Sequence, residues 1–308
     1  MAATPTGRMV EATIDGRPVA VPEGSTIREA CAALGIEVPT LCFLENLAPV
    51  NVCRVCVVEV EGSRTLVPSC SRVLEPGMVV RTDTPRVRHS RRMVLELLAS
   101  AVDLSAAGEA VAGWMAAYGA DPGRYGPAGP AWQPAPAGQA PATDPGARAV
   151  LRQPVKEDNP LYVRDYSRCI LCYKCVEACG EEAQHTFAIA VGGRGFDAHV
   201  TTEFDVPLPE SACVYCGNCV GVCPTGALMP LREAVLRREG RWDPARQTVT
   251  ATICPYCGVG CTLELHVQDN RIIKVTSPLE SPVTHGHLCV KGRYGFAFVE
   301  GPQADPAS

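Results

Sequence analysis

CILCYKCVEAC, residues 169–179, decides the fold of the region around it, because its four cysteines follow the spacing C-x2-C-x2-C-x3-C. The same spacing returns in CVYCGNCVGVCP, residues 213–224. Three closely spaced thiolates on one tight loop bind three irons of a cubane, which leaves the last iron for a cysteine from elsewhere. The repeat therefore predicts two [4Fe–4S] clusters built by two similar loops.

This repeat follows the two-cluster ferredoxin pattern, in which the fourth cysteine of each run binds the other run's cluster. The predicted ligand sets are Cys169, Cys172, Cys175 with Cys223, and Cys213, Cys216, Cys219 with Cys179. We expect each fourth cysteine to start a helix that leads away. Pro224 follows Cys223 as the pattern requires, whereas Gly180 follows Cys179. Zinc is the main alternative, but zinc sites rarely use four such closely spaced cysteines twice.

A second group of cysteines lies near the N-terminus with the spacing C-x10-C-x2-C-x13-C: Cys42, Cys53, Cys56 and Cys70. Four thiolates in one loop suit a [2Fe–2S] cluster, although the spacing differs from that of plant-type ferredoxins. The flanking sequence indicates the fold. Residues 9–21 predict a hairpin with Asp15-Gly16 at its turn, and residues 26–35 predict a helix with a capping box between Thr26 and Glu29.

Further strands are expected at residues 57–62 and 78–82. Two strands, a helix, a cysteine loop and more strands describe a β-grasp ferredoxin domain, which we place at residues 8–103 with a trailing helix. Cys31 lies in the predicted helix, on the face of its apolar residues. We therefore interpret Cys31 as a small buried hydrophobic residue rather than a ligand.

The third group has the spacing C-x2-C-x3-C-x27-C: Cys254, Cys257, Cys261 and Cys289. It suits another [4Fe–4S] cluster, and zinc is a stronger competitor here than in the other groups. Two alternating runs within residues 262–277 meet at Asp269-Asn270 and predict a hairpin. We expect a small β-rich domain at residues 248–300, after a two-cluster domain at residues 155–245. The fold class is then α+β, and Cys31 alone of 17 cysteines has no assigned cluster.

Composition narrows the classes of function. The formal charge is −5, and the basic stretch at residues 236–241 alternates with acidic and apolar residues, so it predicts a solvated helix face and no nucleic-acid partner. The N-terminus lacks the apolar core of a signal peptide, and no run of about 18 apolar residues predicts a membrane span. We expect a cytoplasmic protein whose cysteines are thiols or metal ligands.

Catalytic groupings are not evident in the sequence. It shows no Ser/His/Asp grouping and no Gly-rich phosphate loop, so we assign no catalytic residue. His285 and His287 lie near Cys289, and we interpret them as polar loop residues. Gly217, Gly221 and Gly258 lie among the ligands, where either close approach of the backbone to sulfur or ordinary turn geometry explains them.

Together these groups resemble the N-terminal region of the catalytic subunit of cytoplasmic, NAD-linked molybdenum or tungsten formate dehydrogenases, over residues 8–103 and 155–300. The 42–70 run is also similar to the [2Fe–2S] domains of the complex I 75-kDa subunit and of [FeFe]-hydrogenases. CPYCGVGC at residues 254–261 with CVKGRYG at residues 289–295 is similar to the cluster loop that precedes the bis-pterin domain of formate dehydrogenases.

The resemblance implies one [2Fe–2S] and three [4Fe–4S] clusters, with molybdopterin (bis-MGD, binding Mo or W) only through a partner chain. It implies that Lys291 lies between cluster and pterin and helps electrons to cross; a plain surface charge is the alternative. The implied partners are a molybdopterin-containing catalytic subunit and a flavin/NAD diaphorase subunit.

Two departures from the family pattern stand out. Residues 99–121 contain no Cys or His, where the family carries a cluster segment with one histidine and three cysteines. Residues 104–150 are rich in Ala, Gly and Pro and predict a flexible linker with a short helix near residues 106–118. The chain also ends soon after residue 295, so we expect the molybdopterin domains either on a separate subunit, which the polar Pro- and Ala-containing tail favours, or missing from an N-terminal fragment.

The sequence thus predicts an iron–sulfur electron-transfer component of a formate dehydrogenase, with no self-contained catalytic site. One alternative is a free multi-cluster ferredoxin-like carrier. Another is a subunit of an NADH dehydrogenase or a hydrogenase diaphorase, a class expected to lack the loop at residues 254–261.

Overall fold

The computed structural model describes residues 7–126 and 148–300. These residues form two compact units, which are described separately. The first contains residues 7–43 and 49–126, and the second contains residues 44–48 and 148–300.

The first unit is built on a five-stranded sheet with the strand order β2-β1-β5-β3-β4. Its strands are β1 (Met9–Ile14), β2 (Arg17–Pro22), β3 (Val57–Val60), β4 (Val67–Pro68) and β5 (Val79–Arg81). β1 is parallel to β5 and antiparallel to β2, while β3 is antiparallel to both β5 and β4. With helix α1 (Ile27–Ala33), this mixed sheet forms the β-grasp ferredoxin domain that the sequence predicts.

Local sequence explains the first hairpin and α1, and both predictions are confirmed. Asp15 and Gly16 have φ angles of 48° and 76°, the left-handed pair that a tight two-residue turn needs. Thr26 caps α1 by accepting a hydrogen bond from the Glu29 backbone N–H, and the Glu29 carboxylate accepts one from the Thr26 N–H. Cys31 is fully buried in the core between sheet and helix, as expected of a hydrophobic residue.

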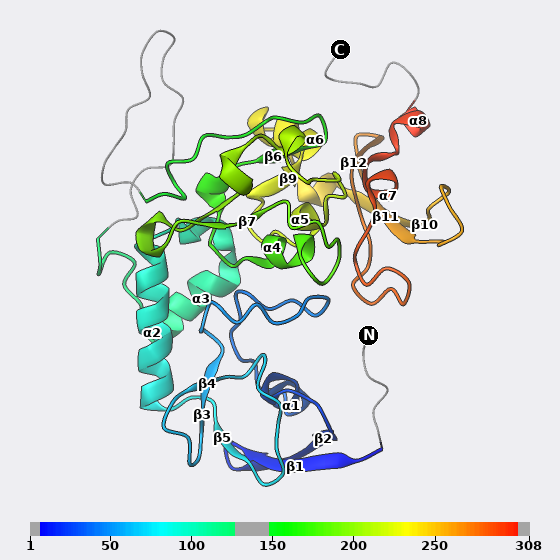
Figure 1. The fold of residues 1–308 in the computed structure, drawn as a ribbon. Helices are drawn as coiled ribbons and strands as arrows, with labels where there is room; N and C mark the ends of the chain where they lie inside the picture. The colour runs from blue at the N-terminus through cyan, green and yellow to red at the C-terminus, as the bar shows by residue number, and fades with distance from the viewer. Residues whose placement is uncertain (1–6, 127–147, 301–308) are drawn as a thin grey trace. The chain divides into compact units, whose positions relative to one another are not determined.

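The trailing helix of this unit is α2 (Pro85–Ala99), and α3 (Glu109–Tyr118) lies beside it (Figure 1). The Arg88 guanidinium donates to the Ala117 carbonyl at 2.6 Å, and Arg91 donates to the Tyr118 hydroxyl at 2.8 Å. The short helix expected near residues 106–118 is therefore present and packed on α2. The sequence predicts a flexible linker over residues 104–150, whereas residues 104–126 contain this packed helix. Residues 127–147 of that linker lie outside the described residues.

The second unit contains two small antiparallel sheets and three short helices around the cysteine runs. The sheets pair β6 (Tyr162–Arg164) with β9 (Leu228–Pro230), and β7 (Ala190–Gly192) with β8 (His199–Thr201). The helices are α4 (Lys174–Cys179), α5 (Asn218–Gly221) and α6 (Leu231–Arg238). α4 and α5, one from each cysteine run, pack side by side (Figure 1).

Short 3-10 turns connect these elements in both units. They are η1 (Leu104–Ala107), η2 (Tyr166–Arg168), η3 (Gly195–Asp197), η4 (Glu203–Asp205), η5 (Leu208–Glu210) and η6 (Pro244–Arg246). Much of the dicluster region is therefore loop and single-turn structure rather than long helices or strands.

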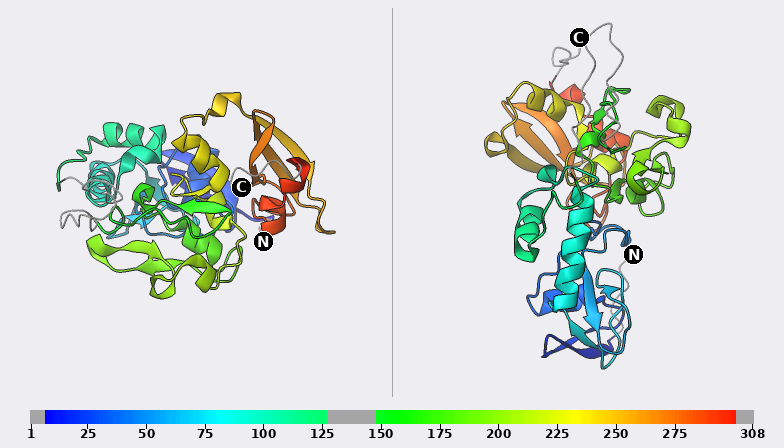
Figure 2. Two further views of the ribbon diagram at one scale, coloured as in Figure 1. Left: turned by 90° about the horizontal axis from the view of Figure 1, so that it is seen from above. Right: turned by 90° about the vertical axis from the view of Figure 1, so that its left-hand side faces the viewer.

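A three-stranded antiparallel sheet ends the second unit, in the order β10-β11-β12 (Figure 2). Its strands are β10 (Thr248–Ile253), β11 (Thr262–Gln268) and β12 (Arg271–Thr276), followed by α7 (Val290–Tyr294) and α8 (Ala297–Glu300). The predicted hairpin is confirmed, with left-handed Asp269 and Asn270 at its turn. The sequence did not predict β10, which is exposed along its whole length.

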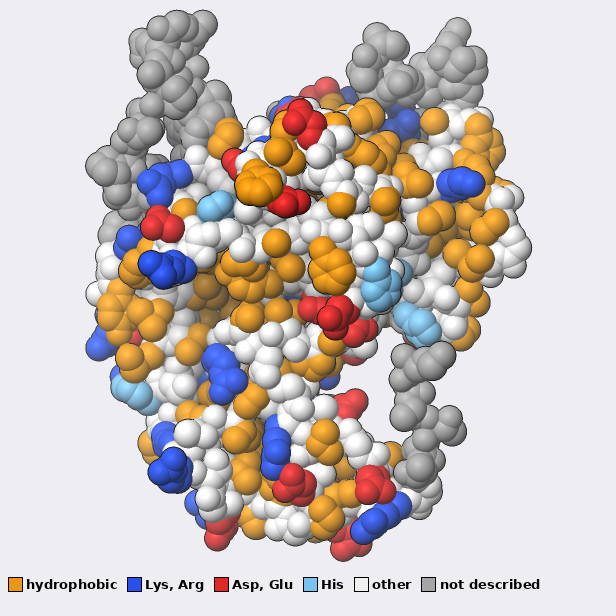
Figure 3. All heavy atoms as spheres, viewed as in Figure 1, with side chains coloured by type: hydrophobic (Ala, Val, Ile, Leu, Met, Phe, Trp, Pro, Cys, Tyr) orange, Lys and Arg blue, Asp and Glu red, His pale blue; other side chains and the backbone are white. Residues whose placement is uncertain are grey.

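The surface carries both signs of charge. On the face drawn in Figure 3, Lys and Arg side chains are interspersed with Asp and Glu and form no continuous basic stripe. Within the described residues, no helix is long and apolar enough to cross a membrane.

Candidate cluster sites

The first site lies at the N-terminal cysteine loop, where the structure brings the four expected cysteines together as two pairs. The Sγ atoms of Cys42 and Cys53 are 3.3 Å apart, and those of Cys56 and Cys70 are 3.4 Å apart. Cys42, Cys56 and Cys70 are buried, and Cys53 is half-buried. A dense set of four sulfur donors in an enclosed loop is the chemistry that a [2Fe–2S] cluster requires.

The pairing shifts the acidity of these thiols. The hydrogen bond within each pair lowers the pKa of one sulfur, that of Cys53 to about 5 and that of Cys56 to about 7. The same hydrogen bonds raise the pKa values of Cys42 and Cys70, and burial raises them further because it disfavours a charge. One sulfur of each pair is thus readily a thiolate, the form that binds iron.

Arg91 of α2 is a buried residue at this site that no sequence pattern singles out. Its Nε donates to the Val55 carbonyl at 3.1 Å and its Nη2 to the Val57 carbonyl at 3.0 Å. These carbonyls belong to the residues on either side of Cys56, so the Arg91 guanidinium holds this part of the cysteine loop against α2. Its separation in sequence from the loop explains why no local signal indicates it.

The two runs of the dicluster region share one backbone design. In the first run, Leu171 and Tyr173 have left-handed φ angles of 54° and 58°. The equivalent positions of the second run, Tyr215 and Gly217, have φ angles of 58° and 72°. Each run therefore winds tightly between its cysteines, which turns backbone N–H groups toward the sulfurs: Leu171 N lies 3.4 Å from Cys169 Sγ and Tyr215 N lies 3.4 Å from Cys213 Sγ.

The structure brings Cys169, Cys172, Cys175 and Cys223 into one neighbourhood, the first expected crosswise set. The pKa of Cys169 is raised to about 12, mainly by burial and in part by the charges of Cys172 and Cys223. The pKa of Cys175 is likewise raised, first by burial and then by the other three sulfurs. Four thiols that disfavour one another's charge fit a site in which iron supplies the compensating positive charge.

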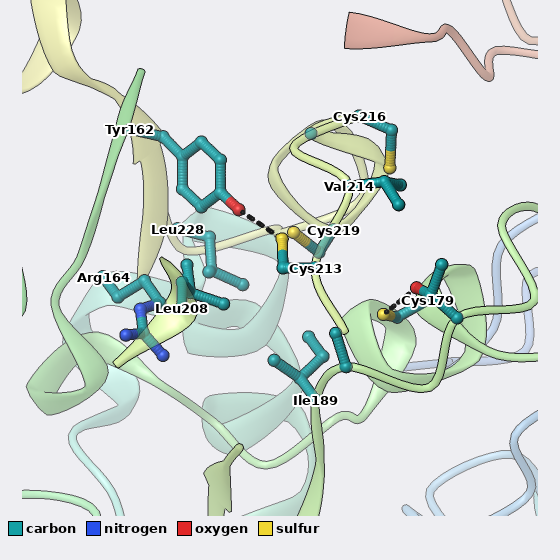
Figure 4. A pocket seen from close by; sticks show the side chains of 13 residues that line it. Tyr162, Arg164, Cys179, Ile189, Leu208, Cys213, Val214, Cys216, Cys219 and Leu228 are labelled. Atoms are coloured by element: carbon teal, nitrogen blue, oxygen red, sulfur yellow. Dashed lines mark hydrogen bonds between the residues drawn. The ribbon is translucent and has the colours of Figure 1, made fainter. Parts of the chain in front are cut away.

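The second crosswise set lines part of a pocket that, with the solvent-open space at its mouth, has an empty volume of about 380 Å³ (Figure 4). Its lining includes all four expected cysteines: Cys179, Cys213, Cys216 and Cys219. Apolar side chains from Ile189, Leu208 and Leu228 close the remaining walls. The Tyr162 hydroxyl points at Cys213, with 3.4 Å between oxygen and sulfur, and the tyrosine is 1% exposed. The sulfur donors and the enclosed space both fit a [4Fe–4S] cluster.

One expectation about the fourth cysteines is wrong. α4 runs from Lys174 to Cys179, so Cys179 ends the helix rather than starting one. α5 likewise ends at Gly221, before Cys223. Gly180, which replaces the expected proline, donates its N–H to the Val176 carbonyl at 2.9 Å and so closes α4. A proline has no N–H and could not make this bond.

The glycines of the second run, Gly217 and Gly221, are explained by close contact with α7 rather than by contact with sulfur. A Cβ atom at Gly217 would lie 2.4 Å from the Arg293 Cδ and 2.4 Å from the Tyr294 hydroxyl oxygen. A Cβ at Gly221 would lie 3.1 Å from the Arg293 guanidinium. Gly258 has open space around it. The first two glycines therefore admit the side chains of α7, and neither expected explanation names this contact.

The third site lies where β10 ends, β11 begins and α7 starts, because Cys254 follows β10, Cys261 precedes β11 and Cys289 caps α7. The Cys254 N–H donates to the Cys261 carbonyl at 2.8 Å. Burial raises the pKa of Cys261, and the charges of Cys254, Cys257 and Cys289 raise it further. The four expected cysteines thus share one neighbourhood, but Cys257 and Cys289 are exposed.

Residues near this third site are placed as follows. Lys291 lies in α7, two positions after Cys289, with its side chain exposed. His287 makes hydrogen-bond contacts with the Asn46 side chain and carbonyl at 3.4 and 3.2 Å, and burial lowers its pKa. The His285 carbonyl accepts from the Asn46 side chain at 2.7 Å. Both histidines therefore act as loop residues in contact with Asn46.

Across residues 7–126 and 148–300, no three Cys, His or acidic side chains converge closely enough to hold one metal ion. What the structure does show at each set is four sulfurs in a common neighbourhood.

Comparisons with known proteins agree with this order of sites. A family model described as "2Fe-2S iron-sulfur cluster binding domain" matches residues 7–85. One described as "4Fe-4S dicluster domain" matches residues 168–227, and one described as "Molybdopterin oxidoreductase Fe4S4 domain" matches residues 247–301. The chain therefore consists of a β-grasp [2Fe–2S] domain, a two-cluster [4Fe–4S] domain and a small β-rich [4Fe–4S] domain, in that order.

Three curated relatives align with almost the whole chain. An NADH-quinone oxidoreductase subunit of Rhizobium meliloti is 36% identical over 95% of this chain and 32% of its own length. The alpha subunit of the NADPH-Fe(3+) oxidoreductase of Geobacter sulfurreducens is 34% identical over 96% of this chain and 32% of its own length. A Staphylococcus aureus protein provisionally named a formate dehydrogenase is 26% identical over 94% of this chain and 31% of its own length.

One solved structure is similar to most of the chain. An NAD+-reducing [NiFe]-hydrogenase chain has 25% sequence identity and a TM-score of 0.56, over 72% of this chain and 87% of the hydrogenase chain. The chain spans about a third of the length of the three curated relatives. What they share with it is the iron–sulfur region.

Proposed function

We propose that this chain is the iron–sulfur electron-transfer region of a cytoplasmic formate dehydrogenase. It would pass electrons between a molybdopterin-containing catalytic subunit and a flavin/NAD diaphorase subunit. The observation that carries the proposal is the third cysteine set. It lies in residues 247–301, which match a molybdopterin oxidoreductase Fe4S4 domain, and its Cys257 and Cys289 are exposed, while Arg293 of the same domain donates to the Cys216 carbonyl of the dicluster loop.

A chain of clusters suits this reaction. Formate oxidation releases two electrons, and NAD+ accepts two as a hydride, whereas iron–sulfur clusters transfer one electron at a time. The role of this protein is to hold the clusters in enclosed sulfur-lined sites and to orient backbone N–H groups toward the sulfurs. Such bonds and the exclusion of water set the potential of each cluster.

The proposed order of transfer follows the chain from its C-terminal site. Electrons would enter at the Cys254–Cys289 set, pass to the two cubane sites and then reach the [2Fe–2S] site and the diaphorase subunit. Lys291 supports this entry point, since it is exposed and only two residues from Cys289. We propose that its ammonium group lies between the cluster and the pterin.

A second candidate function is supported by the relatives. The two with the higher identities are named as NADH-quinone and NADPH-Fe(3+) oxidoreductase subunits. Their alignments cover 95% and 96% of this chain, so they necessarily include most of residues 247–301. Alignment over this region therefore does not separate the NAD(P)H oxidoreductases from the formate dehydrogenases, contrary to the expectation from sequence. A free ferredoxin-like carrier is less well supported, because these relatives are named as subunits.

The test is to isolate the chain with its partners from its host under anaerobic conditions. Formate, NADH and NADPH are then added separately while the reduced clusters are followed by EPR spectroscopy, and molybdenum and tungsten are assayed. Reduction by formate in a complex that contains either metal would support the proposal. Reduction by NAD(P)H alone, without either metal, would favour the second candidate, and a chain that purifies alone would favour a free carrier.

A substitution locates the entry point. Cys257→Ser should abolish reduction of the remaining clusters by formate, while dithionite still reduces them. Cys31→Ala is the matched control, because Cys31 is buried and lies outside all the ligand sets. Unchanged reduction by formate in Cys257→Ser would contradict entry through the third set.

A further inference from the structure

Arg293 of α7 is the feature that most clearly joins two cysteine sets. Its Nε donates to the Cys216 carbonyl at 3.0 Å, and its Nη2 donates to the Asn218 side-chain oxygen at 2.9 Å. A longer contact of 3.4 Å joins its Nη1 to the Val275 carbonyl of β12. One side chain thus holds the loop of the second cubane set, the last sheet and the helix that starts after Cys289.

Among the residues that the structure describes, the charge of this side chain has no carboxylate partner. Arg293 is 4% exposed, and within the described residues its hydrogen-bond partners are neutral oxygens. A buried guanidinium is costly unless a negative charge lies near it. The ionisable groups close enough to interact with its charge are the Cys216, Cys219 and Cys289 thiols and the Tyr294 phenol. Burial raises the pKa of Tyr294, so its phenol is neutral and supplies no negative charge. A [4Fe–4S] cluster with four thiolates is a net anion and would supply the missing compensation.

The backbone around Arg293 is shaped to receive it. Gly217 has a left-handed φ of 72°, and any Cβ there would overlap both Arg293 and Tyr294. Asn218 is 3% exposed, and its side-chain oxygen also accepts from the Leu288 N–H at 2.9 Å, next to Cys289. Two features therefore position Arg293. Gly217 leaves room for it, and the Asn218 side-chain oxygen accepts hydrogen bonds from both Arg293 and Leu288.

We propose that Arg293 is a positioning residue that holds a fixed positive charge between the Cys179/Cys213/Cys216/Cys219 cluster and the Cys254–Cys289 cluster, and raises the reduction potential of the former. The inference rests on the proposed assignment of these cysteines to clusters. Reduction adds one negative charge to the cluster, so a nearby cation stabilises the reduced state more than the oxidised state. No bond forms or breaks, and only an electron moves.

The experiment compares Arg293→Gln with Arg293→Lys in the full chain carrying its clusters. Anaerobic redox titration followed by EPR gives the midpoint potential of each cluster, and loss of one signal in Cys213→Ser identifies the cluster of interest. We expect Arg293→Gln to lower that midpoint by the equivalent of at least a tenfold change in the reduced-to-oxidised ratio, about 59 mV for one electron. Arg293→Lys should retain most of the wild-type value, because it keeps the charge.

The matched control is Arg238→Gln, which removes an exposed positive charge paired with Glu157 in the same unit. It should leave the midpoint unchanged. A purely structural role would lower the stability of both Arg293 variants without moving the midpoint of either, and that result would overturn the inference. If Arg293→Gln does not bind its clusters, Arg293→Lys still tests the inference. A midpoint potential in Arg293→Lys that is lower than the wild-type value by about 59 mV or more would overturn it.

If the assignment of these cysteines to a cluster is wrong, the experiment gives a different result. If Cys213→Ser retains every EPR signal of the wild type, the set does not bind a cluster, and the proposed function loses one of its carriers. If the signal is lost in Cys213→Ser but the midpoint is unchanged in Arg293→Gln, only the role of Arg293 is wrong.

Discussion

The dicluster region and the C-terminal cluster domain hold cysteines in opposite ways. Around the two cubane sets, Cys169, Cys172 and Cys175 are buried and the other five cysteines are half-buried, on loops and single-turn helices. The C-terminal set instead lies at the edge of a regular three-stranded sheet, with two of its cysteines exposed. In the first region iron would join loops that have few backbone hydrogen bonds between strands, whereas in the second it would be added to the edge of a paired sheet.

Removal of iron tests this difference most directly and should have the largest effect. Where metal binding supplies folding free energy, the apo region unfolds. We expect anaerobic chelation of iron to reduce the amide hydrogen-exchange protection of residues 162–230 by roughly 100-fold or more. The amides of β11 and β12 should keep more of their protection, because their strand-to-strand hydrogen bonds do not involve iron, even though Cys254 and Cys261 belong to the core beneath them.

The first domain serves as an internal control in the same experiment. Its β1–β2 hairpin pairs along six residues and packs on α1 over a large core, so it should remain protected without iron. Equal loss of protection in the dicluster region and in the sheet β10–β12 would show that the two regions do not differ as described.

The sequence predicts the parts of this molecule that depend on spacing. The hairpin at Asp15-Gly16 and the capping box at Thr26 follow from residues close together in the chain, and the structure confirms both. The crosswise sets follow from the spacing within each run, and the structure brings the cysteines of each set near one another. Local rules work here because turns and loop-borne ligands are defined within a few residues.

The contacts that hold the sites together could not be predicted in this way. Arg293 is 77 residues from Cys216, and Arg91 is 36 residues from Val55, so no periodicity connects them. Gly217 shows the same limit, since its need for a missing side chain becomes visible only once α7 lies against it. The sequence indicates which residues bind metal more readily than which residues arrange them.

Oxidation should also distinguish the dicluster region from the C-terminal cluster domain, with a smaller effect than removal of iron. The susceptibility of a cysteine sulfur to oxidation increases with its exposure. The cluster bound by the exposed Cys257 and Cys289 should therefore be lost first, at a rate roughly tenfold higher than that of the dicluster region. The chain without partners is treated with limiting ferricyanide, the remaining EPR signals are followed, and released cysteines are alkylated and identified by mass spectrometry. Early alkylation of Cys169 or Cys175 would contradict the difference in enclosure.

The same experiment on the isolated complex sharpens the comparison. If a catalytic subunit covers the exposed side, the rate of loss of the C-terminal cluster should fall toward that of the cubane clusters. The cubane clusters, already enclosed by this chain, should lose iron at the same rate with and without partners.

Two tyrosines give the smallest and most specific comparison. Tyr162 is 1% exposed, and its hydroxyl lies 3.4 Å from the Cys213 sulfur, to which it donates when that sulfur is a thiolate. Tyr256 is 42% exposed, and its hydroxyl donates to the Gly295 carbonyl. Removal of a buried hydrogen bond costs about 1 kcal/mol, whereas an exposed substitution changes stability by less than about 0.5 kcal/mol.

Tyr162→Phe should therefore speed the anaerobic loss of cluster absorbance in urea by about fivefold, while Tyr256→Phe leaves the rate close to that of the wild type. Tyr162→Phe should also lower the midpoint potential of the Cys213 cluster, because the hydroxyl stabilises the more negative reduced state. Equal effects of both substitutions on the rate would mean that enclosure does not distinguish the two sites. A faster rate with an unchanged midpoint would assign the Tyr162 hydroxyl to packing rather than to the sulfur.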